Sequence, residues 1–221
     1  MTPTLPIALP APLKVKPRLR GVIHFLSFFV SLGGIAELAM SPLTGWRYVS
    51  GIIYACSLAL LLGLSALYHR PMWSHAMRAR LRLVDHCGIF ALIAGSYTPF
   101  AALVSPHSFS WGLLFMWLGA LGGIAHVFLN NHGNRVLRAA VYVVLGLSTA
   151  PLVFTLPAFI GWGRVSLLLA GAVIYIAGAG VYAKRWPNPK PSVFGYHEVF
   201  HTFVVIAAAL HFSVIWSIQQ G

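Results

Sequence analysis

Long apolar segments recur along the chain and are separated by short polar connections. Each is close to the 20 or so residues that an α-helix needs to cross the hydrocarbon core of a bilayer. The uncharged stretch from His86 to Asn134 is too long for one span, and Ser105-Pro106-His107-Ser108 supplies a turn within it. The pattern predicts an all-α membrane protein with seven spans, at residues 21–40, 49–69, 83–104, 110–130, 137–156, 163–183 and 197–218.

Composition supports this reading. Only 8% of the residues are charged, 58% are hydrophobic and the mean hydropathy is +0.80. A soluble domain carries roughly a quarter charged residues, so this chain could not cover a water-facing surface. Little of its length remains for a domain outside the membrane.

The basic residues predict how the bundle is oriented, because cytoplasmic loops carry an excess of Lys and Arg. With the N-terminus inside, the inner segments hold 13 of the 15 basic residues, and the outer side keeps Arg47 and Arg164. Seven spans with a cytoplasmic N-terminus and an external C-terminus fit this alternation. The net charge of +12 does not indicate a nucleic-acid partner, since such a partner needs a solvated basic face. Membrane lipids are the expected surroundings.

The chain divides into a tail and a membrane domain. Residues 1–20 contain five prolines and four basic residues, which predicts a disordered basic tail. Residues 21–218 form the predicted membrane domain. No clear small-residue cleavage site follows the first apolar run, so we expect an uncleaved first span and not a signal peptide.

Polar residues within spans are costly in lipid and therefore indicate function. His197 and His201 occupy positions i and i+4 in the pattern H-E-x-x-H at the start of the last span, and so share one helix face. Ser65 and His69 have the same spacing at the end of the second span, and Asp85 begins the third. The predicted topology brings these residues to one depth, near the cytoplasmic interface.

Three histidines and a nearby carboxylate are typical of zinc sites, in which three histidine ligands leave a fourth position for water. Zinc lowers the pKa of that water from about 15.7 to about 7. We therefore predict a zinc site formed by His69, His197 and His201. Asp85 would hold or deprotonate the water, Ser65 would bind a substrate oxygen, and the implied chemistry is hydrolysis at the membrane surface.

The other polar residues receive lesser roles. His211 lies about 15 Å beyond His201 along the helix and is excluded from the site. Of the neighbours Asp85 and His86, only one is expected to face the centre, and we favour Asp85. Single histidines at helix ends are expected to be interfacial with wet tips, namely His24, His75, His107, His126 and His132. Glu198 is expected to be solvated beside Lys190, while Glu37 stays unexplained.

At these residues the chain resembles a known family. Ser65-x-x-x-His69, the run from Asp85 through Phe90 to Ala94-Gly95-Ser96-Tyr97-Thr98-Pro99, and His197-x-x-x-His201 are similar to the ordered motifs of the hemolysin III family. The Lys16-to-His24 opening looks like a bacterial branch of that family. The resemblance implies a seven-span fold shared with progestin and adiponectin receptors and alkaline ceramidases, and a bacterial inner-membrane location. It also implies zinc on His69, His197 and His201.

The family pattern fits the rest of the site, with one departure. Its Asp and Ser fall on Asp85 and Ser65. The Glu and Asn that precede the first-span histidine in many relatives are replaced here by Pro-Arg-Leu-Arg-Gly, so the resemblance assigns no role to His24.

Several functions are compatible with these residues. The first is a zinc-dependent, ceramidase-like hydrolase of lipid amides or esters. The second is the pore-forming or haemolytic activity of the family name, although a polar stripe through several spans is missing. The third is a zinc-stabilised receptor without chemistry. A membrane metalloprotease with Glu198 as general base is a weaker alternative. The sequence does not define an acyl chain, a headgroup or an oligomeric state.

Overall fold

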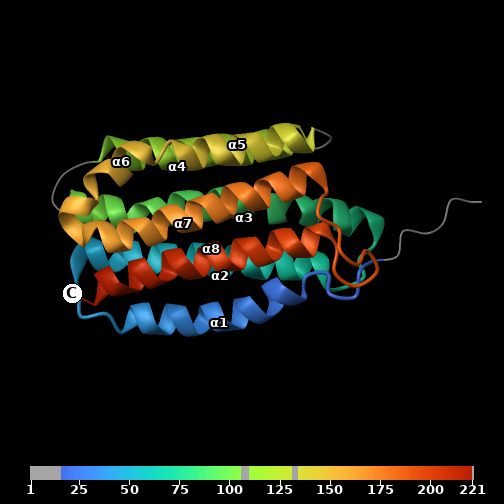
Figure 1. The fold of residues 1–221 in the computed structure, drawn as a ribbon, viewed down its shortest axis with the longest axis horizontal. Coiled ribbons are helices and arrows are strands. Elements are labelled where there is room, and N and C mark those ends of the chain that lie inside the picture. The colour runs from blue at the N-terminus through green and yellow to red at the C-terminus, as the bar shows by residue number, and fades with distance from the viewer. Residues whose placement is uncertain (1–15, 106–109, 131–133, 221) are drawn as a thin grey trace, which may run out of the picture.

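The computed structural model describes residues 16–105, 110–130 and 134–220. Within them it has seven apolar segments long enough to cross a membrane, one of which is broken into two helices. The helices are α1 (Val22–Ala39), α2 (Gly45–His69), α3 (His75–Val104), α4 (Trp111–Leu129), α5 (Arg135–Leu147), α6 (Ala150–Thr155), α7 (Pro157–Lys184) and α8 (Tyr196–Gln219). The axes of the long helices are roughly parallel, and successive spans run in opposite directions, as Figure 1 shows. The predicted seven-span, all-α bundle is therefore confirmed.

The ends of the predicted spans agree with these helices to within two residues, except that α2, α3 and α7 begin four to eight residues earlier than expected. α3 begins at His75, because the Ser74 hydroxyl caps it by accepting from the Met77 N–H at 3.3 Å and the helix then continues through three arginines before the apolar run. α7 begins at Pro157, but Gly161 interrupts it with φ 74° and ψ 159°. Only glycine adopts such a backbone at no steric cost, so the straight part of α7 starts close to the predicted residue 163.

Helices α2 and α3 are the most enclosed spans, and α8 packs against them from the other end of the sequence. One cluster of buried side chains joins them to α1 and α7, with Tyr54, Phe100, Val165 and Ile215 among its members. Figure 1 places α1 on one side of this core and α4, α5 and α6 on the other. Several polar residues of α2, α3 and α8 lie in the interior of the bundle, namely Ser65, His69, His86, Glu198 and His201.

One end of the bundle, which we call the basic end, holds the end of α2 and the beginnings of α3 and α8. Here the chain before α1 lies against the loop between α7 and α8. The Arg18 N–H donates to the Ser192 carbonyl and the Leu19 N–H to the Val193 carbonyl, each at 3.1 Å. The described part of the predicted tail, residues 16–20, is thus packed on the membrane domain. The division of the chain at residue 20 stays a prediction.

Candidate functional site

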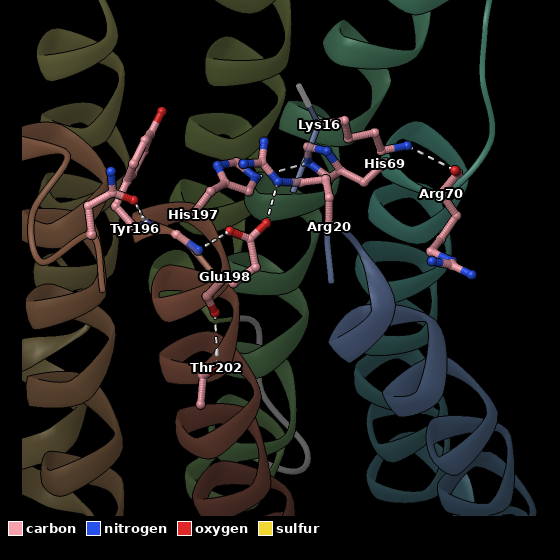
Figure 2. Close-up of polar contacts among 10 residues, drawn as sticks. Lys16, Arg20, His69, Arg70, Tyr196, His197, Glu198 and Thr202 are labelled. Carbon is pink, nitrogen blue, oxygen red and sulfur yellow. Dashed lines mark hydrogen bonds and ion pairs between the residues drawn. The ribbon is translucent and has the colours of Figure 1, made fainter. Parts of the chain in front are cut away.

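Three histidines meet at the basic end. His69 is the last residue of α2, His197 is the second residue of α8, and His201 follows one helical turn later. One ring nitrogen from each lies within 4.8 Å of the others, and the Nε2 atoms of His69 and His197 are 3.0 Å apart. Figure 2 shows the rings of His69 and His197 turned toward each other. The juxtaposition predicted from helical spacing is observed.

This geometry suits a metal ion. Two nitrogens bound to tetrahedral zinc at its usual bond length are separated by about 3.3 Å, which falls between the 3.0 Å of the nearest pair and the 4.8 Å limit of the group. His69 and His201 are also buried, at 7% and 3% exposure. Small rotations of the rings would complete the ligand set without moving a helix.

Ser65 and Asp85 lie at the same end. Ser65 is one turn before His69 on α2 and is 2% exposed. The Asp85 carboxyl group on α3 lies beside it. Both residues line one cavity together with the three histidines. The proposed metal ligands and the proposed catalytic pair therefore share a common space, while the roles of Ser65 and Asp85 stay predictions.

His86 differs from the expectation that only one of the adjacent pair faces the centre. Asp85 and His86 both line the cavity, and the His86 Nδ1 is 3.8 Å from an Asp85 carboxylate oxygen. The cavity reaches both side chains, although adjacent residues of a helix point about 100° apart. The same His86 ring nitrogen also contacts the Arg82 carbonyl.

His24 is a fourth histidine in the cluster, and the expectation of a wet interfacial tip is wrong for it. It is only 2% exposed, and its ring stacks on His201 with centroids 3.8 Å apart and planes 12° apart. Its depth, one turn into the first span, was the signal that could have placed it beside His201. His75 is exposed and His126 half-buried, whereas His107 and His132 lie outside the described residues.

Glu198 also differs from expectation. It is 1% exposed and not solvated beside Lys190. Its carboxylate pairs with the Arg20 guanidinium and accepts a 2.7 Å hydrogen bond from the Gly195 N–H. Figure 2 shows Arg20 reaching past His197 to this carboxylate. The sequence could not show this pair, because its members are 178 residues apart.

The shared cavity extends from the histidines far into the bundle. Its volume is about 910 Å³, at the large end of the range for small-molecule sites. It reaches Phe100 on α3, which is 15 residues past Asp85 and hence about 22 Å along the helix. Beyond the polar end its walls are mainly apolar, including Leu61, Leu92, Phe100, Leu156 and Val165. His211 lies on this wall and, as expected, outside the histidine group.

A bundle of seven apolar spans around an interior polar site defines a multi-pass membrane protein. The family model described as "Haemolysin-III related" matches residues 13–212, nearly the whole chain. The chain therefore belongs to the haemolysin-III related family.

Individual relatives agree with this assignment. The chain is 33% identical to the "Hemolysin-3 homolog" of Bacillus subtilis over 203 residues, 88% of this chain and 91% of the relative. It is 30% identical to the human "Monocyte to macrophage differentiation factor" over 183 residues, 77% and 71% of the two chains. A Drosophila melanogaster "Adiponectin receptor protein" is 27% identical over 212 residues, 88% of this chain and 47% of that protein.

Proposed function

We propose that this protein is a zinc-dependent hydrolase of lipid amides or esters in the inner membrane of a bacterium. The observation that carries the proposal is the position of the His69, His197 and His201 nitrogens. They lie at the end of a long apolar cavity that also exposes Asp85 and Ser65. Zinc would be held by the three histidines, and when bound it would supply Lewis-acid polarisation and an activated water.

The remaining roles follow from the positions of the side chains. The Asp85 carboxylate accepts a proton from the attacking water and returns it to the leaving nitrogen or oxygen. The Ser65 hydroxyl, which lies beside Asp85, orients that carboxylate or a substrate oxygen. Water adds to the acyl carbonyl, the carbon–nitrogen or carbon–oxygen bond breaks, and a fatty acid and an amine or alcohol are released.

The cavity walls favour a lipid substrate. Several lining residues are also exposed on the outer surface of the bundle, among them Phe154 on α6 and Trp162 on α7, which are 81% and 70% exposed. Their exposure supports entry of an acyl chain from the side of the bundle. An apolar wall of this kind stabilises a chain by the same burial that stabilises a protein core.

The protease alternative is disfavoured by the environment of Glu198. A general base must reach the water that it activates, but this carboxylate is occupied by Arg20 and the Gly195 N–H. The pore alternative rests on the names of relatives such as the Bacillus cereus "Hemolysin-3". The far part of the cavity is lined mainly by apolar side chains, which does not favour ion passage.

The test is lipid hydrolysis by purified, zinc-loaded protein. We expect it to release fatty acid from a mixture of ceramides and acyl lipids, detected by mass spectrometry. Asp85→Asn should lower the rate about 100-fold or more, since positioned acid–base groups contribute that much, and should keep its zinc. Glu37→Gln, which changes an exposed carboxylate elsewhere, is the matched control and should keep full activity.

Equal release by the wild type and Asp85→Asn would end the catalytic proposal. Zinc without any hydrolysis would favour the receptor alternative. Leakage of dye from liposomes that depends on the protein but not on His201 would favour the pore.

A further inference from the structure

Arg138 on α5 is a buried cation that lines the same cavity. It is 9% exposed, and among the described residues its side chain makes no hydrogen bond or ion pair. Its guanidinium nitrogens are not among the fully buried atoms without a partner, and they reach the cavity, where an anionic ligand would compensate the charge. The positive-inside pattern of the sequence includes Arg138 but gives no reason for burying it.

The charged residues around Arg138 are mainly positive. Six arginines line the cavity, namely Arg20, Arg78, Arg82, Arg135, Arg138 and Arg185, whereas Asp85 is the one acid among its described lining residues. Arg20 pairs with Glu198, and the other five lining arginines still outnumber the single lining acid. A concave site with walls of low dielectric concentrates such a field and attracts anions.

Arginine also specifies the kind of anion. Its planar guanidinium presents two parallel N–H groups that match the oxygens of a phosphate. Arg135, one turn before Arg138, lies over the Tyr182 ring with its guanidinium carbon 6.0 Å from the ring centroid. This contact holds a second guanidinium at the cavity wall.

The cluster lies next to the proposed reaction centre. Tyr142 lies one turn deeper in α5 than Arg138, and both residues line the cavity. The Tyr142 hydroxyl donates to the His86 carbonyl at 3.4 Å, and His86 adjoins Asp85. A ligand with its acyl carbonyl at Asp85 and its chain in the apolar part would therefore bring its headgroup to Arg138.

From this juxtaposition we propose that the cavity binds an acyl lipid whose headgroup carries a phosphate, and that Arg138 is the principal residue for recognising that phosphate. This inference rests on the proposed function, because it takes the cavity to be a lipid site. It adds that the lipid carries a phosphate in its headgroup. Arg138 is a specificity residue here and takes no part in bond breaking.

The experiment measures lipid binding to the full chain in a neutral detergent by native mass spectrometry. The probes are a monoacylglycerol phosphate, the monoacylglycerol with the same acyl chain, and glycerol phosphate alone. We expect the phosphate lipid to bind at least about tenfold more tightly than the other two probes. Hydrogen bonds to a charged group contribute enough free energy for an affinity ratio of that size. Glycerol phosphate binding as tightly as the lipid would overturn the assignment to a lipid.

Variants locate the effect. Arg138→Gln should weaken binding of the phosphate lipid about tenfold and leave the neutral lipid within twofold. Arg80→Gln removes the same charge from an exposed position outside the cavity and should change nothing. Arg138→Lys keeps the charge but not the two-pronged geometry, so it should bind with intermediate affinity and also serves if the Gln variant does not fold. Equal weakening by Arg80→Gln and Arg138→Gln would overturn the proposal.

Measuring lipid binding and lipid hydrolysis separately distinguishes this inference from the hydrolase. If Arg138 governs binding but no lipid is hydrolysed, the phosphate site stands and the hydrolase fails. If the wild type and Arg138→Gln bind and hydrolyse the phosphate lipid equally, the hydrolase stands and the phosphate site fails.

Discussion

The two ends of the bundle differ in whether their polar side chains have hydrogen-bond partners within the protein. At the far end, where α8 terminates beside the start of α2, several polar side chains have partners within the protein. The Ser41 hydroxyl donates to the Gln219 carbonyl, Arg47 donates to the Ile218 carbonyl at 3.0 Å, and the Gln219 amide donates to the Arg47 carbonyl at 3.1 Å. These contacts tie the last turn of α8 to the α1–α2 connection and need no ligand to complete them.

At the basic end the buried groups are not all satisfied by the protein. The ring nitrogens of His69 and His197 face each other, and neither ring nitrogen of His24 has a hydrogen-bond partner among the described residues. Buried polar groups in folded proteins are nearly always hydrogen-bonded, so exceptions indicate strain or a ligand. The comparison teaches that contacts within the protein hold the far end together, whereas the basic end contains buried groups that a ligand would complete, as we propose.

The largest expected effect is the loss of metal from the basic end. Purified wild-type protein should contain about one zinc per chain, measured by inductively coupled plasma mass spectrometry. A His69→Ala, His197→Ala, His201→Ala variant should contain less than about a tenth of that, because no ligand of the site remains. A variant that keeps its zinc would remove the assignment.

The matched control is His126→Ala, which changes a histidine on α4 outside the group. It should keep the wild-type zinc content. His24→Phe keeps a flat ring against His201 without nitrogens, so it should also keep most of the zinc. Loss of zinc in His24→Phe would make His24 a ligand instead of a packing partner.

The next effect concerns the ion pair that joins the chain before α1 to α8. Glu198→Gln keeps an oxygen for the Gly195 N–H but leaves Arg20 without its charge partner. Breaking a buried pair costs about 3 kcal/mol or more, and Arg20 is partly exposed at 19%, so we expect about 2 kcal/mol. That corresponds to a fall of about 4 to 8 °C in the thermal unfolding midpoint for a chain of this length.

A double variant checks the cause of that fall. Arg20→Gln with Glu198→Gln removes both charges, so its midpoint should lie above that of Glu198→Gln alone. Additive losses would show that the two side chains stabilise the basic end independently. Lys184→Gln, an exposed cation near the same end, should leave the midpoint within about 1 °C.

The sequence predicted the parts of this structure that depend on local pattern. Apolar length defined the seven spans, and helical spacing placed His197 and His201 on one face. The charge alternation then implied that His69 and Asp85 lie at the same depth. Each step uses only spacing along a helix or the direction in which a span runs, and both can be read from one chain.

The remaining features depend on which helix faces lie against each other, and spacing does not determine that. The Arg20–Glu198 pair joins two distant segments, so Glu198 was expected to be solvated by its neighbours in sequence. Arg138 was explained entirely by the positive-inside pattern, since that pattern does not separate a solvated arginine from a buried one. His24 could have been placed by depth, but its stacking on His201 required the packing of α1 on α8.

The smallest expected effect is at the far end. Gln219→Leu removes the amide that donates to the Arg47 carbonyl, and that carbonyl still accepts from the Ser50 hydroxyl. The loss should therefore be that of one neutral hydrogen bond, about 1 kcal/mol, or about 2 to 4 °C in the unfolding midpoint. Zinc content and lipid binding should stay at wild-type values. If Gln219→Leu lost zinc or lipid affinity, the two ends would be coupled through α8. The contacts at the far end would then not be purely structural.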